Sequence, residues 1–346
     1  MKNNKKQNSL PLVSVIMPIR NEEKYIKECL EQIICQKYPK NKMEILVIDG
    51  MSEDKTREIV NRESTIANRK FNIHIRLIDN PKKNRFPALN IGVKNAKGDF
   101  IFRVDARTII PKDYILKCVT TLLETGADNV GGIQKPLAVK GTQQAIGLAM
   151  SHPFGVGNAQ FRIGKKSGFV DSVYLGCFRK SIFKKIGLFD EKSGIISEDS
   201  DINHRIRVAG GRVYLNKDII AYYYPRDNFK DLWKLYFRYG GSRAGNFYKH
   251  GTLRLRQLVP PGFLATIVLL MFLSLITLLF LKILCTILVG YALIDIVFSF
   301  WLAIKNNRAP LFLKLLIIFP CMHFAWALGF FKRLFQGRNY KKDWQY

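Results

Sequence analysis

The sequence LVSVIMPIRNE, residues 12–22, passes from an apolar run into a polar tail and sets the pattern for the first half of the chain. Leu, Val, Ile and Met fill most of residues 12–18, a composition typical of a strand buried on both faces of a sheet. Apolar residues then recur at helical spacing from Ile26 to Ile34. The segment therefore predicts a strand, a polar turn and a helix.

The same alternation repeats up to about residue 125. Further strands are predicted at EILVIDG (44–50), IHIRLID (73–79) and DFIFRVDA (99–106). Helices are expected to begin near residue 54 and to cover residues 87–96 and 113–124. Strands that alternate with helices form βαβ units around a largely parallel sheet. The fold class is therefore expected to be α/β, with a less regular, glycine-rich continuation over residues 130–228.

Polar residues follow each predicted strand. They are Pro18, Arg20 and Glu22; then Asp49, Ser52 and Asp54; then a basic loop that ends at Arg85; and then Asp105 and Arg107. Ligands of such sheets bind beyond the carboxyl ends of the strands. Carboxylates accept hydrogen bonds from a base or ribose, and cations balance a diphosphate. We therefore expect a nucleoside-diphosphate site here, although each residue alone also fits a helix cap or a turn.

The chain carries a formal net charge of +28, from 55 Lys and Arg against 27 Asp and Glu. Such a charge suits anionic lipid headgroups and phosphorylated substrates. Nucleic acid is the other interpretation, and we reject it because the chain has a long apolar region and no recognisable recognition helix. The six cysteines are scattered without metal-ligand spacing, which excludes a zinc ribbon and argues against a disulfide scaffold.

The C-terminal third is strongly apolar. Residues 263–281 and 283–304 are each long enough for the ~20 residues of a membrane span. Residues 310–331 form a third span or a re-entrant segment broken at Pro320. The start of the chain does not read as a signal peptide, because a charged segment follows the first apolar run. We therefore expect a multi-pass protein of the cell membrane with its α/β domain in the cytoplasm, in agreement with the positive-inside rule.

The helix expected over residues 227–248 is amphipathic, with aromatic residues such as Trp233 on one side. Its place before the first span favours a helix lying at the membrane surface, although a core-facing helix fits the same pattern. The expected organisation is a basic tail (1–10), a catalytic domain (11–226), the interfacial helix and linker (227–260), the membrane region (261–331) and a second basic tail (332–346).

Four motifs in order resemble the inverting family 2 glycosyltransferases with a GT-A fold. They are V-x-V-I-x-P-x-R-N-E (13–22), V-I-D-G-x-S-x-D-x-T (47–56), A-L-N-I-G-V (88–93) and S-E-D-S-D-I-N-H-R (197–205). A closer resemblance, to exopolysaccharide transferases of the succinoglycan ExoA-like type, rests on R-V-D-A (103–106), H-P-F-G-V-G-N-A (152–159), D-S-V-Y-L-G-C-F-R (171–179), Y-Y-P-R (223–226) and M-H-F-A-W-A-L-G-F (322–330).

The resemblance implies a Rossmann-like nucleotide-diphospho-sugar transferase domain and assigns roles to its motifs. Asp199 is implied as the base, with Glu198 orienting that site, Asp49 contacting the donor base, and Asn90 on a ligand-facing helix. The acceptor side is implied to include Gly176, Arg179, Asn203, Arg205 and Arg238. Inverting transfer needs a base on the acceptor hydroxyl and cationic help for the departing diphosphate. An acidic helix start is the structural alternative for residues 198–201.

The metal motif of the family departs from its usual form. Members typically carry D-x-D or D-x-H, whereas this chain has Asp105-Ala106-Arg107, and arginine cannot ligate a cation. Either Asp105 holds Mg²⁺ or Mn²⁺ with water and substrate oxygens, or Arg107 supplies the positive charge directly. A loss of catalysis is the third possibility.

The Q-x-x-R-W motif of processive synthases is absent, and Arg238 stands roughly in its place. Three apolar segments are too few for a polymer channel, which favours the transfer of a single sugar. The expected reaction joins a sugar from a nucleoside-diphosphate donor to a polyprenyl-diphosphate-linked saccharide during cell-surface polysaccharide synthesis. The alternatives are a polyprenyl-phosphate sugar synthase and a non-catalytic nucleotide-sugar-binding membrane protein. The sequence does not assign an oligomeric state.

Overall fold

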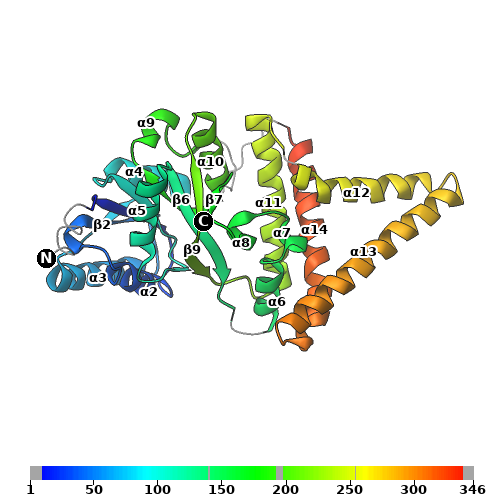
Figure 1. Ribbon diagram of the computed structural model, residues 1–346, viewed down its shortest axis with the longest axis horizontal. Helices are drawn as coiled ribbons and strands as arrows, with labels where there is room; N and C mark the ends of the chain where they lie inside the picture. The colour runs from blue at the N-terminus through cyan, green and yellow to red at the C-terminus, as the bar shows by residue number, and fades with distance from the viewer. Residues whose placement is uncertain (1–9, 139–140, 192–197, 254, 338–346) are drawn as a thin grey trace.

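The structure is a computed structural model that describes residues 10–138, 141–191, 198–253 and 255–337. Residues 1–9 of the first basic tail, Ser197 of the acidic motif and residues 338–346 of the second tail lie outside the described residues. The chain folds into a sheet-centred body from which an apolar helical region extends (Figure 1).

One mixed sheet forms the centre of the body. Its strands are β1 (Val13–Ile19), β2 (Met43–Asp49), β3 (His74–Asp79), β4 (Phe100–Arg103), β5 (Thr108–Ile109), β6 (Asn129–Pro136), β7 (Gly168–Phe169), β8 (Tyr174–Arg179) and β9 (Val213–Tyr223). They lie in the order β3-β2-β1-β4-β8-β6-β9-β5, with β7 beside β9. The strands β3, β2, β1 and β4 are parallel, as predicted. β8 runs antiparallel to β4. Ile19 pairs with Asp49, and Asp49 with Asp79, so the carboxyl ends of β1–β3 are aligned.

Helices cover both faces of this sheet (Figure 1). The helices between β1 and β9 are α2 (Ile26–Ile34), α3 (Thr56–Phe71), α4 (Arg85–Asn95), α5 (Tyr114–Thr125), α6 (Gly141–Ala149), α7 (Pro153–Val156), α8 (Gln160–Ile163), α9 (Ile182–Ile186) and α10 (Glu198–Val208). Of these, α6 and α7 pack against α14. Short 3₁₀ turns occur at Lys40–Lys42 and Ala309–Leu311. The strands and helices predicted before residue 125 are confirmed to within a few residues. The predicted strand over 99–106 ends early, at Arg103, because the backbone turns where the Thr108 amide donates to the Asp105 carbonyl at 2.9 Å.

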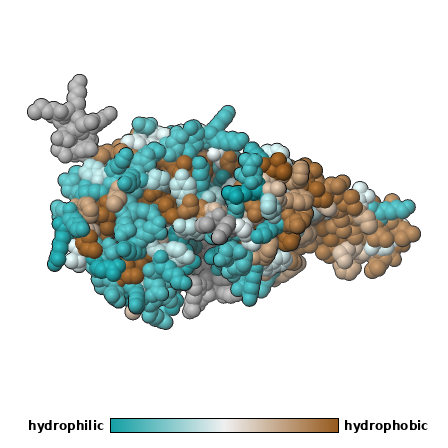
Figure 2. Space-filling view, turned by 90° about the horizontal axis from the view of Figure 1, so that it is seen from below, coloured by the Kyte–Doolittle hydropathy of each residue, from teal (hydrophilic) through white to brown (hydrophobic). Residues whose placement is uncertain are grey.

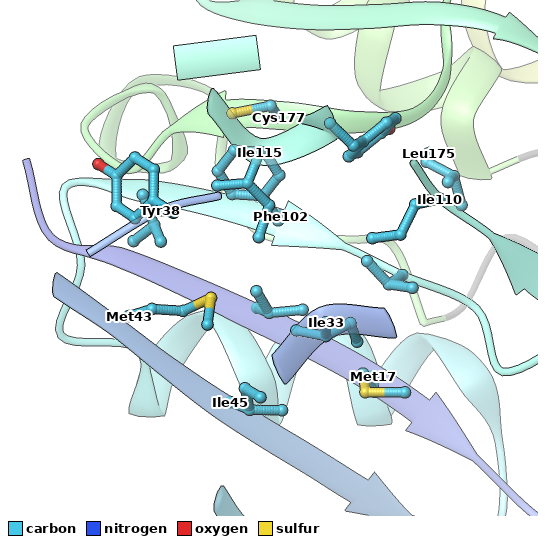
Figure 3. Packing of buried hydrophobic residues seen from close by; sticks show 14 of the residues in the cluster. Met17, Ile33, Tyr38, Met43, Ile45, Phe102, Ile110, Ile115, Leu175 and Cys177 are labelled. Atoms are coloured by element: carbon cyan, nitrogen blue, oxygen red, sulfur yellow. The ribbon is translucent and has the colours of Figure 1, made fainter. Parts of the chain in front are cut away.

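The central strands are largely apolar, as expected for strands buried on both faces, although β1 contains Ser14 and β4 ends at Arg103. On one face, Met17, Ile33, Phe102 and Ile115 pack together, and Figure 3 shows these side chains between the strands and the surrounding helices. On the other face a second cluster includes Ile16, Leu46, Leu89, Ile202 and Val213. Two apolar cores, one on each face, therefore stabilise the sheet. Polar residues lie at the carboxyl ends of its strands.

Helix α11 (Phe229–His250) packs along α14 (Phe312–Phe335), and the two lie side by side in Figure 1. The apolar stripe of α11, which includes the buried Leu232 and Tyr236, belongs to a core shared with α6 and α14. Leu232 and Tyr236 are therefore covered by α14, as the core-facing alternative expects, whereas Trp233 is 38% exposed. An interfacial position for residues 227–260 stays a prediction.

Two glycines allow this close contact. A methyl group added at Gly240 of α11 would lie 1.9 Å from the carbonyl oxygen of Trp326, and one at Gly329 of α14 would lie 1.9 Å from that of Phe237. The two backbones therefore approach more closely than any larger residue allows. Helix α14 also runs through Pro320 without interruption, so the predicted break at Pro320 is wrong.

Helices α12 (Leu255–Leu273) and α13 (Leu278–Lys305) form a hairpin that projects from the body (Figure 1). Its surface is largely apolar in Figure 2, with Phe272 67% exposed and Leu275 84% exposed. The predicted span over 263–281 is wrong in its end, because α12 stops at Leu273 and the Thr277 hydroxyl accepts from the Leu279 amide at the start of α13. By length and composition, the described helices that can cross a membrane are Leu278–Lys305 and Ala309–Phe335.

Candidate active site

A cavity of about 1170 Å³ lies at the carboxyl edge of the sheet and extends to the C-terminal helices. The predicted site residues that line it are Pro18, Glu22, Arg85, Asp105, Arg107, Glu198, Asp199 and Arg238. Its far part is lined by residues of α12, α13 and α14, including Phe263, Tyr291 and Trp326. One continuous space therefore joins a carboxylate-rich end to an apolar end.

Arg103, at the last position of β4, organises the carboxylate-rich end. Its Nε and Nη2 donate to the two oxygens of Asp105 at 2.8 and 2.9 Å. Its Nη1 lies 2.8 Å from Asp199 Oδ1 and 2.7 Å from Glu198 Oε1. Only 2% of the Arg103 side chain is exposed. One buried guanidinium thus brings together carboxylates that lie more than ninety residues apart in the sequence.

Glu198 and Asp199 begin helix α10, where the amide dipoles favour negative charge. Arg85 Nη2 donates to Glu198 Oε2 at 2.9 Å, so both oxygens of Glu198 are paired with guanidinium groups. Asp199 Oδ1 is held by Arg103, whereas no described residue forms a hydrogen bond with Asp199 Oδ2. Burial raises the pKa of Asp199 to about 7, the positive charge of Arg103 opposes that rise, and Glu198 and Asp105 add to it. The carboxyl group is therefore suited to exchange a proton near neutral pH.

Glu22 and Arg107 form a second ion pair at the cavity. Arg107 Nε donates to Glu22 Oε2 at 2.9 Å, and the guanidinium lies 5.0 Å from the centre of the Tyr25 ring. Burial raises the pKa of Glu22, and the hydrogen bond and charge of Arg107 oppose that rise. The Arg107 side chain is 53% exposed, so its positive charge faces the solvent side of the cavity edge.

The donor set at Asp105 does not fit a divalent cation in this arrangement. Both carboxylate oxygens of Asp105 accept from Arg103, and the second position of the motif is Arg107. Across the described ranges, no group of three His, Cys, Asp or Glu side chains is placed to hold a metal ion. The predicted Mg²⁺ or Mn²⁺ site at Asp105 therefore lacks the ligands that a cation needs in this arrangement. The cationic groups next to Asp105 are guanidinium groups.

A separate polar cluster lies at the ends of β2 and β3. Arg57 Nη1 donates to Asp49 at 2.6 Å and to Asp79 at 2.8 Å, and the Ser52 amide donates to Asp49 at 3.0 Å. Asp49 is fully buried and does not line the cavity.

Two more of the predicted donor residues have partners outside the cavity. Asp54 accepts from the Glu23 and Thr56 amides, and Arg20 pairs with Glu53 at 3.7 Å. The predicted donor residues therefore divide between the cavity and this neighbouring cluster.

Several predicted site residues hold the fold together instead of lining the cavity. Asn90 exchanges hydrogen bonds with the backbone of Phe189, and Arg179 donates to the carbonyls of Ala127 and Leu122. Arg205 pairs with Asp201 on the same helix at 3.0 Å.

Two further members of the predicted acceptor side are also internal. Asn203 is buried and accepts from Asn129, and Gly176 has a φ of +93° with the Phe178 ring against it. Asn203 and Gly176 thus belong to the interior of α10 and β8, and their roles as substrate contacts stay predictions.

Sequence reasoning missed four arginines. Arg103 carries a signal that was available, a charge inside the apolar strand FIFRV, because a buried arginine needs carboxylate partners. Arg57 directly follows the motif at residues 47–56. Arg162 and Arg226 also line the cavity; Arg162 lies three residues after the segment 152–159, and Arg226 ends the segment 223–226, both of which carried the family resemblance.

Comparisons with known proteins identify the family and the fold. The family model of glycosyl transferase family 2 matches residues 14–187. The chain is 29% identical over 333 residues to the dolichyl N-acetyl-alpha-D-glucosaminyl phosphate 3-beta-D-2,3-diacetamido-2,3-dideoxy-beta-D-glucuronosyltransferase of Methanococcus voltae, covering 94% of this chain and 98% of that protein. It is 30% identical over 331 residues to the succinoglycan biosynthesis protein ExoA of Rhizobium meliloti (strain 1021), covering 94% and 96%.

The fold is also that of a solved structure. The mannosyltransferase PcManGT from Pyrobaculum calidifontis, in complex with GDP-Man and Mn²⁺, matches with a TM-score of 0.60 over 95% of this chain and 89% of that chain, at 19% identity. The molecule is thus a glycosyltransferase with a GT-A fold. The chain belongs to glycosyl transferase family 2, and the resemblance seen in its motifs is confirmed.

Proposed function

We propose that the enzyme moves one sugar, with inversion, from a nucleoside-diphosphate sugar to a saccharide carried on a polyprenyl diphosphate, in cell-surface polysaccharide synthesis. The observation that supports this most directly is the cavity itself. It places Asp105 and Asp199 on one guanidinium at one end and apolar membrane-type helices at the other. The polar end of this cavity therefore suits a sugar, and its apolar end suits a lipid tail.

In the proposed reaction Asp199 is the base. Its carboxylate takes the proton of the acceptor hydroxyl while that oxygen forms the new bond to the anomeric carbon. The bond between the anomeric carbon and the diphosphate oxygen breaks, and its electron pair leaves with the nucleoside diphosphate. Arg103 orients Asp199 through the 2.8 Å contact with Oδ1. A correctly placed base contributes about 10²–10⁴-fold to the rate.

The departing diphosphate needs positive charge, which arginine supplies by paired hydrogen bonds. Arg107 and Arg85 stand on the donor side of the cavity next to Asp105 and Glu198, and we assign this role to them. This is the second of the three alternatives left open by the sequence, and no step of the proposal passes through a metal ion. Asp49 and Ser52, beside Arg57, are proposed to contact the base and ribose of the donor.

The lipid-linked acceptor is supported by the apolar helices and by the relatives. The Methanococcus protein is named for a dolichyl N-acetylglucosaminyl phosphate acceptor, and ExoA for succinoglycan synthesis. We propose membrane attachment through residues 261–331, with residues 11–226 as the catalytic domain in the cytoplasm. Because α11 packs on α14, residues 227–260 join these two parts as a structural element and connecting segment.

The full-length enzyme tests this function directly. Membranes containing it are incubated with UDP-, GDP- and dTDP-sugars and a pool of lipid-linked saccharides, and release of the nucleoside diphosphate is measured. We expect release with one donor class, and we expect Asp199→Asn to lose turnover by about 10²-fold or more while still binding that donor. Donor binding without turnover under all acceptors would refute the proposal. Turnover on bare polyprenyl phosphate would identify a polyprenyl-phosphate sugar synthase instead.

A further inference from the structure

The cavity is lined by more arginines than are paired with the carboxylates at its catalytic end. Eight arginines and five carboxylates line it among the described residues. Arg103, Arg107 and Arg85 are each paired with a carboxylate. The excess positive charge therefore lies elsewhere in the cavity wall.

Three of the other arginines come from three separate elements. Arg162 lies on α8, Arg226 follows the end of β9, and Arg238 lies on α11. All three are partly buried. Within the described part of the chain, none of them has a carboxylate oxygen within 4.0 Å. Because a partly buried arginine has less water around its charge than an exposed one, leaving it without a carboxylate partner costs free energy. Such a cluster is suited to an anion.

The surroundings hold these arginines in place without neutralising them. Arg162 Nη1 donates to the Tyr223 hydroxyl at 2.9 Å, and its guanidinium lies 5.4 Å from the centre of the Tyr223 ring and 5.5 Å from that of Phe161. Among the described residues, Arg238 donates only to the Lys234 carbonyl one turn earlier on its helix. Burial lowers the pKa of Arg238, and the positive charge of Arg226 lowers it further. A bound anion would relieve this repulsion between like charges.

The wall of the same cavity also carries hydrogen-bonding groups that have no partner among the described residues. Trp326 Nε1, on α14, is buried and has no hydrogen-bond partner among the described residues, and the same is true of both amide atoms of Asn246 on α11. Both residues line the cavity. Because buried polar atoms are normally paired, these groups also point to a polar ligand in this space.

We infer that Arg162, Arg226 and Arg238 form the site for the phosphate group that joins the acceptor lipid to its first sugar. This inference rests on the proposed function and adds to it the position of the acceptor. The sugar then reaches Asp199, the phosphate lies among the three arginines, and the lipid tail runs toward Phe263, Tyr291 and Trp326. Arginine suits this group because its planar fork binds phosphate oxygens in pairs.

A short-chain lipid phosphate can test the site without knowledge of the natural acceptor. The full-length protein in detergent is titrated with farnesyl diphosphate, with farnesol as the tail without phosphate, and with UDP, GDP and dTDP as the donor diphosphate. We expect Arg162→Gln, Arg226→Gln and Arg238→Gln each to weaken farnesyl diphosphate binding by about tenfold or more. Farnesol and nucleotide binding should stay unchanged. The matched control is Arg69→Gln, an exposed arginine on α3 outside the cavity.

The outcomes separate this site from the donor site and from the function itself. Equal loss of nucleotide and farnesyl diphosphate binding would assign the three arginines to the donor and overturn the inference. No loss of farnesyl diphosphate binding in any variant that keeps the wild-type unfolding temperature would overturn it as well. Arg238→Lys keeps the charge without the fork, so partial recovery of binding is expected. Lipid phosphate binding without any sugar transfer would instead refute the proposed function and leave this site standing.

Discussion

Asp105 and Asp199, ninety-four positions apart, are held by the same guanidinium: Arg103 contacts both carboxylates at 2.8 Å. The first follows a central strand and the second begins a helix in the second half of the sheet domain. Because Arg103 is almost fully buried, it fixes the spacing of the two groups. The carboxylate proposed as the base is thereby positioned by the strand that carries the donor-side motif.

The pH dependence of turnover follows from the raised pKa of Asp199, which is about 7. A base acts only when it is ionised, so activity is present above this pKa and is lost as the pH falls through it. We expect kcat/KM to fall by about tenfold per pH unit below about pH 7 and to be level above it. The measurement is the rate of donor-dependent nucleoside diphosphate release between pH 5 and 9. A rate that stays level down to pH 5 would show that Asp199 is not the base.

Arg103→Met should be strongly destabilising. It would leave Asp105, Glu198 and Asp199 together in a buried site without their shared positive charge, and breaking such buried pairs costs about 3–5 kcal/mol. The matched control is Arg107→Met, because its ion pair with Glu22 is half exposed and is worth about 1 kcal/mol or less. Denaturant unfolding of the two variants in the same detergent compares them. Similar losses in both would contradict the central role assigned to Arg103.

Removal of divalent cations should have little effect on the enzyme. Since Asp105 is engaged by Arg103 and the neighbouring position is Arg107, we expect turnover to stay within about twofold after treatment with EDTA. Arg107→Met should reduce turnover, because it removes positive charge from the donor side. The rate is measured before and after chelation and after addition of Mn²⁺. Abolition by EDTA with recovery on Mn²⁺ would mean that Asp105 exchanges Arg103 for a cation.

Gly240→Ala should separate α11 from α14. The added methyl group would lie 1.9 Å from the Trp326 carbonyl oxygen, and overpacking of this kind costs about 1–3 kcal/mol. Gly290→Ala on α13 is the control, since nothing lies within 4 Å of that position and alanine favours a helix. Thermal unfolding in detergent should show a lower midpoint for the first variant only. An unchanged midpoint for Gly240→Ala would mean that the two helices do not need their close contact.

The sheet and its polar edge could be predicted from sequence because their signals are local. Buried parallel strands give continuous apolar runs, and each run here ends at a residue such as Asp49 or Asp105. The division of roles could not be predicted in the same way. Asn90 and Arg179 have the right residue type in the right motif, yet their partners are backbone groups of distant segments.

The arginine cluster was beyond sequence patterns for a different reason. Arg162, Arg226 and Arg238 belong to a short helix, a strand end and a long helix, and only the packing of α11 against the body brings them to one cavity. The apolar stripe of α11 was visible, but its partner α14 begins only at Phe312, 83 residues after the start of α11 at Phe229. Periodicity identifies a face that must be covered and does not identify what covers it.

The contact between α11 and α14 has a consequence for the order of biosynthesis. Chains emerge from the ribosome amino end first, and α14 is the final described helix, after the apolar α12–α13 hairpin. The wall of the cavity formed by Met322, His323 and Trp326 therefore arrives only after that hairpin has left the ribosome. A nascent chain that already holds Asp105 and Asp199 therefore still lacks part of the cavity wall, and the cavity is complete only once α14 has been made and has packed against α11.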